Sequence, residues 1–364
     1  MEYRKLPRGE EQISVIGMGM GIIKPEGTVV EDTVRHALSQ GINYFDLCCY
    51  YEDAFEGFKA GAKDCDRSSY YVQMHLGAVY KNGEYVFSRN LKRIQETFEQ
   101  KLDAGGVEYA DFVFLHCIDE EKDLAKVLND GILAYARELK DRGLARHIAL
   151  STHTPKIALE VLRQDLIDLM MFSINPAFDY TRGEYAYGEV DERAALYRKA
   201  AAMGVGISVM KPFAGGQLLD KRRSPIGVAL TTTQCLHYAL DKPGVVTVLP
   251  GATSPADIDR LMEYFTATEE ERDYSVLGTA TPEEALGHCV YCNHCSPCPK
   301  RINVGLVNKY YDLALLGDGL AREHYLQLTH HASECNDCNH CNVRCPFKVA
   351  QKERMHAIAA YFGI

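Results

Sequence analysis

The sequence predicts an α/β protein: a (β/α)₈ barrel of the TIM type followed by a small, α-rich, ferredoxin-like domain. Apolar runs suited to buried strands alternate eight times with helical periodicity over about 250 residues, which is the size and order of such a barrel. Eight of the thirteen cysteines then fall into two short runs in the last quarter. We therefore divide the chain into a barrel (1–268), a connector (269–284) and an iron–sulfur domain (285–364).

The predicted strands are short apolar runs, as expected for parallel strands buried on both faces. They are Ile13–Gly19, Ile42–Leu47, Tyr70–Leu76, Asp111–Cys117, Arg146–Ser151, Ile167–Ile174, Val205–Met210 and Val245–Leu249. Residues 1–12 in front of them are typical of a short hairpin. A doubly wound sheet gives a similar alternation but rarely eight such even units. The glycines at 17, 19 and 21 also miss the dinucleotide-binding spacing, because residue 22 is isoleucine.

Helical periodicity separates these strands. The clearest segments are Val30–Ser39, Leu91–Leu102, Leu124–Lys140, Arg193–Met203 and Ile258–Tyr264. Pro155 and Pro255 each follow a residue suited to a helix N-cap, and Gly41, Gly143 and Gly204 are placed to end helices.

The cysteines of the last quarter follow the ligand pattern of [4Fe–4S] clusters. Each run has three cysteines at two-residue gaps and then a fourth followed by proline, and the second run has the bacterial spacing. The eight ligands would be Cys289, Cys292, Cys295, Cys298, Cys335, Cys338, Cys341 and Cys345. We expect a crossed pairing, with Cys345 completing the first set and Cys298 the second. The first run is one residue shorter before its fourth cysteine, which leaves this pairing open. A helical segment, Val304–Tyr325, would separate the two runs.

Two other uses of these cysteines have less support. Disulfides are improbable because nothing else in the sequence is typical of a secreted protein. Zinc also takes four thiolates, but usually from two separated pairs rather than from three evenly spaced cysteines plus a Cys-Pro. The spacing favours two [4Fe–4S] clusters.

Composition excludes several classes of function. The net charge of −10 and the pI near 5.7 argue against a nucleic-acid surface, which needs basic clusters. The N-terminus lacks the apolar core of a signal peptide, and no apolar run approaches membrane-spanning length, so we expect no membrane association. A reducing cytoplasm, in a cell living at low oxygen, is the expected location.

Polar residues gather where the predicted strands end, which is where barrels place their reactive groups. Strand two ends with Asp46 and is followed by Tyr51, while strands three, four and five end near His75, His116 and His153. A single histidine at such a rim can serve only to bond a backbone group. Converging histidines beside an acid and a phenol predict a site that handles protons.

Cys48 and Cys49 lie on the same rim. Free cysteine is commonly buried as a small apolar side chain, so we expect both to pack. A thiol that touches a substrate or cofactor is the alternative.

These stretches resemble the aldo/keto reductase family, in its branch with a C-terminal ferredoxin-type domain. The resemblance covers nearly the whole chain and rests on residues 41–46 with Tyr51, 111–116, 147–153, 210–216 and 249–252. It implies carbonyl reduction with NADPH through an aspartate, a tyrosine, a lysine and a histidine. By position, Tyr51 would be the general acid, Asp46 would help to lower its pKa, and His116 would orient the substrate oxygen.

The resemblance also implies a nicotinamide cofactor, and here the sequence departs from the family. Ser151, Asn175, Lys211 and Gly251 remain of the usual cofactor surroundings. His75 stands where the family has its catalytic lysine, and Met171 where it has a glutamine that holds the nicotinamide carboxamide. Residues 253–256 contain no arginine to grip a 2′-phosphate. These departures argue against NADP(H), which the retained residues keep as the alternative cofactor.

Three functions follow from these observations. The favoured one is an iron–sulfur oxidoreductase in which two clusters relay electrons between a carrier such as ferredoxin and the barrel mouth. There Asp46, Tyr51, His75 and His116 would carry out acid–base chemistry on a small carbonyl, hydroxyl or unsaturated substrate. The second is an NADPH-dependent carbonyl reductase with structural or regulatory clusters. The third is a non-catalytic redox-sensing or electron-transfer protein.

Overall fold

Eight parallel strands form the central sheet. The computed structural model describes residues 1–179, 190–279, 287, 289, 291, 295–315, 317–345 and 347–364. The strands are β3 (Met18–Gly19), β4 (Tyr44–Asp46), β5 (Tyr71–Leu76), β8 (Ala110–Leu115), β9 (Ala145–Thr152), β10 (Leu169–Ser173), β11 (Gly206–Met210) and β12 (Val245–Leu249). Parallel backbone bridges from Ile16 to Val248 and from Gly19 to Gly251 join the first edge to the last, so the sheet is nearly closed into a barrel. Seven of the eight predicted strands are confirmed. Of the first, predicted over 13–19, only Met18–Gly19 join the barrel, because Ile13 and Ser14 pair in the N-terminal hairpin.

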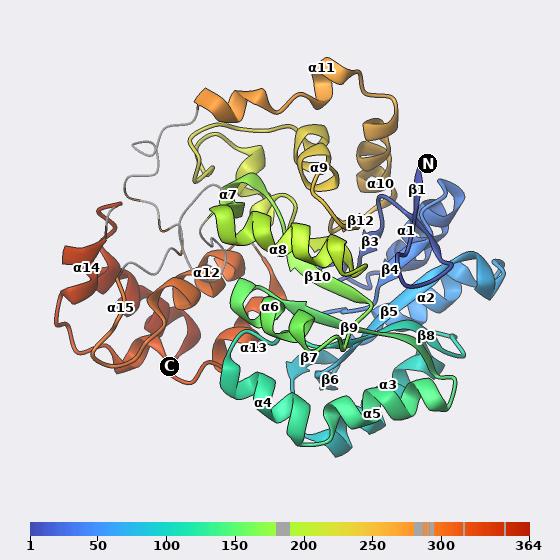
Figure 1. Cartoon of the computed structure of the whole chain (residues 1–364), viewed down its shortest axis with the longest axis horizontal. Coiled ribbons are helices and arrows are strands. Elements are labelled where there is room, and N and C mark those ends of the chain that lie inside the picture. Colours follow the sequence, from blue (N-terminus) through green and yellow to red (C-terminus); the bar gives the residue numbers. More distant parts are fainter. Residues whose placement is uncertain are drawn as a thin grey trace.

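Helices surround this sheet (Figure 1). They are α1 (Val29–Ser39), α2 (Ala54–Ala62), α3 (Leu91–Ala104), α4 (Glu121–Asn129), α5 (Ile132–Asp141), α6 (Pro155–Arg163), α7 (Pro176–Asp179), α8 (Val190–Ala202), α9 (Thr232–Leu240) and α10 (Pro255–Met262). The prediction of one helix over 124–140 is wrong. The chain breaks there at Gly131, whose φ of 93° is left-handed and starts a second helix. Pro155 and Pro255 begin helices as predicted.

The barrel interior is filled by large side chains, which fixes the strand ends in space. Tyr44, Phe112 and Phe114 are fully buried there, and burial of each contributes about 1.5–3 kcal/mol. Phe45 and Phe172, also fully buried, instead pack outward against Phe58 of α2 and Tyr197 of α8. The predicted N-terminal hairpin is confirmed as β1 (Tyr3–Lys5) paired with β2 (Gln12–Ser14). Its buried Leu6 and Ile13 pack with core residues of several strands.

A second hairpin, which the sequence analysis missed, follows β5. Strand β6 (Ala78–Lys81) pairs antiparallel with β7 (Glu84–Phe87). The two turn residues, Asn82 and Gly83, have φ of 55° and 81°, which is the turn that Asn-Gly favours between paired strands. Because it follows the carboxyl end of β5, the hairpin stands beside the barrel mouth.

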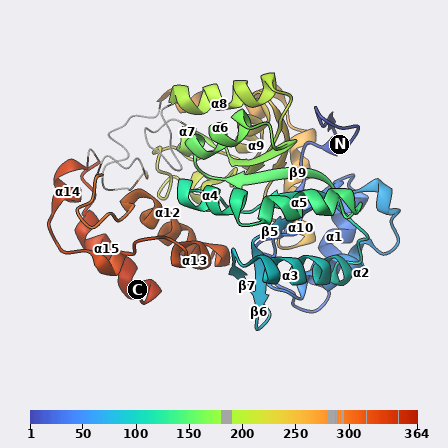
Figure 2. The same cartoon turned by 60° about the horizontal axis from the view of Figure 1, so that its bottom comes forward.

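The C-terminal residues form a helical unit with its own apolar core. Its helices are α12 (Val304–Leu315), α13 (Gly319–Leu326), α14 (His340–Arg344) and α15 (Gln351–Phe362), with the 3₁₀ turn η6 (Ala332–Glu334). The predicted segment 304–325 is thus two helices. This unit lies at one side of the barrel, and α13 lies next to β7 (Figures 1 and 2).

Part of the predicted connector is also described. Its residues up to 279 form the short helix α11 (Glu269–Arg272) and the 3₁₀ turn η4 (Ser275–Thr279), and its remainder lies outside the described residues. None of the helices in the described part of the chain has the length and apolar character needed to cross a membrane.

Candidate active site

A cavity of about 390 Å³ lies at the carboxyl ends of the barrel strands. Its walls include the apolar side chains Ile22, Met171, Met210, Phe213 and Leu249 from the barrel. The C-terminal unit closes part of the mouth with Leu313, Asp318, Leu320 and His324. The candidate site is therefore shared by both parts of the chain.

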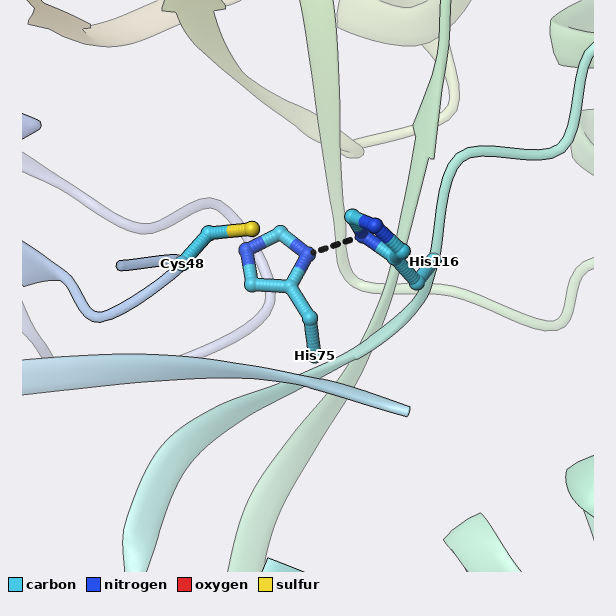
Figure 3. A group of neighbouring side chains, drawn as sticks. All are labelled: Cys48, His75 and His116. Carbon is cyan, nitrogen blue, oxygen red and sulfur yellow. Dashed lines mark hydrogen bonds between the residues drawn. The ribbon is translucent and has the colours of Figure 1, made fainter. Parts of the chain in front are cut away.

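Three of the predicted residues meet in this cavity. His75 Nε2 lies 3.0 Å from Asp46 Oδ1, and its Nδ1 lies 2.9 Å from Nδ1 of His116. Figure 3 shows the two imidazoles bonded, with the Cys48 sulfur on the far side of His75. The side chains of Asp46, His75 and His116 come from the ends of β4, β5 and β8 and are all buried. The prediction that these residues converge agrees with the structure.

Two residues extend this group beyond the barrel strands. The hydroxyl of Tyr85, on β7, lies 2.8 Å from His116 Nε2 and 2.9 Å from Nε2 of His324, on α13. Tyr85 is 1% exposed and His324 is 8% exposed. Asp46, His75, His116, Tyr85 and His324 thus form a continuous chain of hydrogen bonds from the barrel to the C-terminal unit.

The direction of these bonds follows from the carboxylate. An ionised Asp46 can only accept, so His75 carries its proton on Nε2 and accepts on Nδ1. His116 must then donate from Nδ1 and accept on Nε2 from the hydroxyl of Tyr85. The Tyr85 oxygen accepts in turn from Nε2–H of His324. This arrangement of protons satisfies each bond from Asp46 to His324. The Gln73 amide nitrogen, a donor that also lies 3.0 Å from His75 Nε2, is left without a bond to that ring.

Burial keeps two of these imidazoles neutral. Burial and the neighbouring His75 and His324 hold the pKa of His116 well below its usual range. Burial and the charges of His153 and Lys211 lower the pKa of His324 to about 3. At pH 7 both rings therefore have one N–H donor and one free lone pair.

A second polar cluster borders the cavity at the ends of β8 and β9. His153 Nδ1 donates to Asp119 Oδ2 over 2.8 Å, and Tyr310 of α12 donates to the same oxygen over 3.1 Å. His153 Nε2 is buried and has no hydrogen-bond partner among the described residues. Lys309 is also fully buried, and burial lowers its pKa to about 7 although Asp119 opposes the shift. This cluster anchors α12 against the barrel.

Tyr51 does not line the cavity. It is half-buried, its backbone bridges to Glu84 of β7, and its ring packs edge-on against Tyr50 at 4.8 Å. Tyr85 is the phenol that bonds to His116. The two cysteines predicted to pack differ in place: Cys49 is fully buried, whereas Cys48 lines the cavity.

The predicted nicotinamide contacts are partly engaged with other groups. Lys211 Nζ lies 3.3 Å from Asp318 of the C-terminal unit, and Ser151 Oγ accepts from the backbone N–H of Cys117 over 2.7 Å. The Asn175 amide donates to the Lys211 carbonyl and accepts from a backbone N–H, and it does not line the cavity. Ser151, Lys211 and Gly251 do line it. The site therefore fits a nicotinamide only in part.

The described cysteines of the C-terminal unit occupy two places. Cys298 of the first run lines one small cavity together with Cys335, Cys338 and Cys341 of the second run, and Cys295 borders it as well. Cys289 lies elsewhere and accepts a hydrogen bond from Gln351 Nε2 over 3.3 Å. The Cys345 sulfur accepts from the Val349 N–H over 3.4 Å. Cys292 lies outside the described residues.

Sequence reasoning missed Tyr85, Asp119, His324 and the two buried residues Lys309 and Tyr310. A signal existed for Tyr85, because Asn82-Gly83 between alternating residues is a strong hairpin pattern. No local signal identifies His324, which meets a residue 239 positions away in the sequence.

Comparisons with known proteins agree with this barrel fold. The model of the family described as "Aldo/keto reductase family" matches residues 16–234. An L-galactose dehydrogenase of Arabidopsis thaliana is 26% identical over 303 residues, covering 74% of this chain and 89% of the relative. An aldo-keto reductase of Mycobacterium sp. (strain JLS) is 27% identical over 299 residues, covering 80% and 94%. In structure, the holo form of aldo-keto reductase AKR11C1 from Bacillus halodurans superposes with a TM-score of 0.61 at 21% identity, covering 78% of this chain and 97% of that one.

Proposed function

We propose that this chain, which belongs to the aldo/keto reductase family of oxidoreductases, is an iron–sulfur oxidoreductase acting on a small organic substrate at the barrel mouth. Two [4Fe–4S] clusters in the C-terminal unit would exchange electrons with a carrier such as ferredoxin. The observation that carries the proposal is the meeting of Cys298 with the three cysteines of the other run.

Thiolates are the usual ligands of [4Fe–4S] clusters, and we divide the eight cysteines by the crossed pairing, although Cys295 of the second set also borders the cavity of the first. Cys298, Cys335, Cys338 and Cys341 would hold one, and Cys289, Cys292, Cys295 and Cys345 the other. The crossed pairing expected from bacterial spacing is supported by the place of Cys298. The N–H groups that donate to the sulfurs of Cys289 and Cys345 are of the kind that tunes cluster potentials. When bound, the clusters supply one-electron transfer.

The two sites would have different neighbours. Cys289 packs with Tyr291 against Phe178 and Leu218, which follow β10 and β11 of the barrel. Cys338 in the other set is exposed. This difference in surroundings supports electron entry at the cluster held by Cys338 and electron transfer from there toward the barrel, because a one-electron donor must dock at an exposed site.

The cavity suits a compact organic molecule with one polar end. Its apolar wall would hold the body of the substrate, and the buried Asp46, His75 and His116 would face the reacting oxygen. A neutral imidazole with a fixed tautomer has one N–H donor and one free lone pair, so it can both donate and accept a proton. The substrate class we propose is therefore a small carbonyl, hydroxyl or unsaturated compound.

An NADPH-dependent carbonyl reductase remains the second candidate. It is favoured by the family and by the places of Ser151, Lys211 and Gly251 in the cavity wall. Against it stand the Lys211–Asp318 ion pair and Met171 at the position of the expected amide. We rank it second because its contacts fit only in part.

The test begins with protein purified without oxygen. Iron, sulfide and zinc are measured, and the visible spectrum is followed during titration with NADPH and then with reduced methyl viologen. Turnover is measured on a panel of small aldehydes, ketones and enones with each donor. We expect eight irons and turnover with the viologen, whereas bleaching and turnover with NADPH alone would establish the second candidate.

A matched pair of variants tests the cluster ligands. Cys298→Ala removes a proposed ligand, so it should lose about four irons, the content of one cluster. Cys65→Ala removes an exposed cysteine outside both runs and should keep all of them. Zinc in place of iron in the unaltered protein would contradict the proposal.

A further inference from the structure

A side cavity of about 170 Å³ adjoins the substrate cavity at the boundary between the barrel and the C-terminal unit. Its lining includes Arg89, Glu120, Lys122 and Lys126, and both lysines are exposed, so the side cavity reaches solvent. It has room for several water molecules and polar groups to hold them.

His324 and Cys117 line both cavities. Of the two, His324 is also the last member of the hydrogen-bonded chain that ends at Asp46. One end of this chain therefore borders the side cavity, and the other end lies at the buried Asp46 and His75 in the wall of the substrate cavity. Reduction of a carbonyl or an unsaturated bond consumes protons as well as electrons, and these buried residues need a supply of protons once a substrate fills the cavity.

We propose that His324, Tyr85, His116 and His75 form a proton path from the side cavity to the substrate, with His324 at its entrance. The proposal rests on the function proposed above. A proton from water in the side cavity binds His324 Nδ1, and the Nε2 proton of that ring passes to the Tyr85 oxygen. The Tyr85 proton passes to His116 Nε2, and the His116 Nδ1 proton passes to His75 Nδ1. The proton of His75 Nε2 then leaves toward Asp46 or the substrate oxygen. One proton enters and one leaves, and no electron moves along this path.

The geometry meets the requirements of such a path. The three transfers between side chains span 2.9, 2.8 and 2.9 Å, which are ordinary hydrogen-bond distances. All members are buried, so their bonds are not exchanged with water. A ring with one donor and one acceptor nitrogen, or a hydroxyl, can take a proton on one side and release another on the opposite side.

Charged groups around His324 affect how readily its imidazole ring binds a proton. His153 after β9 and Lys211 after β11 lower the pKa of His324. Asp318 just before α13 and Asp119 after β8 raise it. Burial and the positive groups outweigh the two carboxylates, and His324 has no direct carboxylate partner among the described residues. A proton added at His324 is therefore not retained there, which favours its passage to Tyr85.

One alternative at the same place has weaker support. Cys117, Asp119 and His153 could be a metal site, since one possible ligand atom of each lies within 4.8 Å of the others. Both Asp119 oxygens, however, already accept hydrogen bonds, and the buried Lys309 raises the positive potential there. Lys309 itself lines neither cavity.

The test uses His324→Ala, His324→Gln and Tyr85→Phe in the full-length, cluster-loaded protein. Activity is measured on the aldehyde, ketone or enone that the unaltered protein turns over fastest. We expect kcat to fall about 10- to 100-fold in all three, in the range found when groups that support a reacting residue are removed. Added imidazole should restore His324→Ala, because the side cavity can admit the missing ring, and should not restore Tyr85→Phe.

His324→Gln separates a proton path from simple positioning. A glutamine can still donate to the Tyr85 oxygen but cannot pass a proton through. Near-normal activity of this variant would mean that His324 only positions Tyr85 and would overturn the proposal. So would a His324→Ala loss that imidazole does not repair, or normal activity in Tyr85→Phe, whose ring volume is kept.

A control variant and the unaltered protein separate the two proposals. His330→Ala removes a partly buried histidine that bonds to Glu334 and lines neither cavity in the described part of the chain, so it should keep full activity with no response to imidazole. If the unaltered protein turns over no member of the panel with either donor, the proposed function fails. If it does turn over a substrate and the variants behave like it, only the proton path fails.

Discussion

Mild acid should destabilise this protein, because three histidines buried between the barrel and the C-terminal unit are held neutral. His116, His153 and His324 all have depressed pKa values, chiefly because burial penalises the charged ring. The pKa falls to about 4 for His153 and to about 3 for His324. Each ring takes up its proton at pH 6–7 only when the chain unfolds.

The sign and size follow from proton linkage. A depressed folded pKa means that stability is greatest above the unfolded pKa near 6.5 and declines as the pH falls toward the folded value. Between pH 7 and pH 5 each such histidine costs about 2 kcal/mol, so the three together cost about 6 kcal/mol. That is a large share of the roughly 5–15 kcal/mol by which proteins are stable.

One histidine has the opposite sign but does not cancel this loss. Asp168 and Glu11 raise the pKa of His147 although burial opposes them. Its contribution is present at low pH and is lost as the pH rises through the folded value. Below pH 6.5 it is protonated in both states and adds no further pH dependence.

The measurement is denaturant unfolding followed by circular dichroism at several pH values from 7 to 5. Circular dichroism is suited because the chain contains no tryptophan. His324→Gln should reduce the pH-dependent loss of stability by about 2 kcal/mol, one histidine's share. His330→Gln, at a partly buried ring, should leave the loss unchanged. Equal losses in His324→Gln and the unaltered protein would refute the reasoning.

Three further predictions concern the site. Tyr51→Phe should keep kcat within a few-fold of the unaltered protein, because the Tyr51 ring does not line the cavity. A loss of about 100-fold in a steady-state assay would instead support Tyr51 as the general acid predicted from the sequence. If NADPH binds, Asp318→Asn should tighten its binding about fivefold, because the change frees Lys211 from a partly exposed ion pair. Fluorescence titration measures the affinity, and unchanged or weaker binding would contradict the prediction. Gly77→Ala should lower the free energy of unfolding by about 1–3 kcal/mol and displace His116, because an added Cβ at residue 77, whose φ is 136°, would lie 3.0 Å from the His116 Cβ. Thermal unfolding checks this, and an unchanged melting temperature would contradict it.

The sequence was sufficient for the barrel because its signals are local. Each strand is a short apolar run, and each helix has its own period, so the order of elements follows from patterns within about ten residues. Asp46, His75 and His116 were found for the same reason, since the carboxyl end of a strand fixes where a side chain emerges. The single helix expected over 124–140 failed because the apolar period continues across Gly131, whereas the backbone does not.

The rest of the site depends on contacts that no local pattern encodes. His324 reaches the cavity only because α13 docks against β7, and Tyr310 reaches Asp119 only because α12 packs beside it. Such docking is decided by the shapes of two folded surfaces. The prediction for Tyr51 concerns such a contact as well. Its spacing from Asp46 matches the family, whereas the β6–β7 hairpin places a second phenol, Tyr85, against His116.

The β6–β7 hairpin has an evolutionary consequence. Its ten residues follow the carboxyl end of β5, where barrels tolerate variation in loops, and its Tyr85 bonds one partner on each side. A barrel with the hairpin but without the C-terminal unit would leave the Tyr85 phenol with half its bonds, and one with the unit alone would leave His324 without this acceptor. The hairpin and the C-terminal unit are therefore expected to be inherited together, so a hairpin of this kind should mark those relatives that have the C-terminal unit.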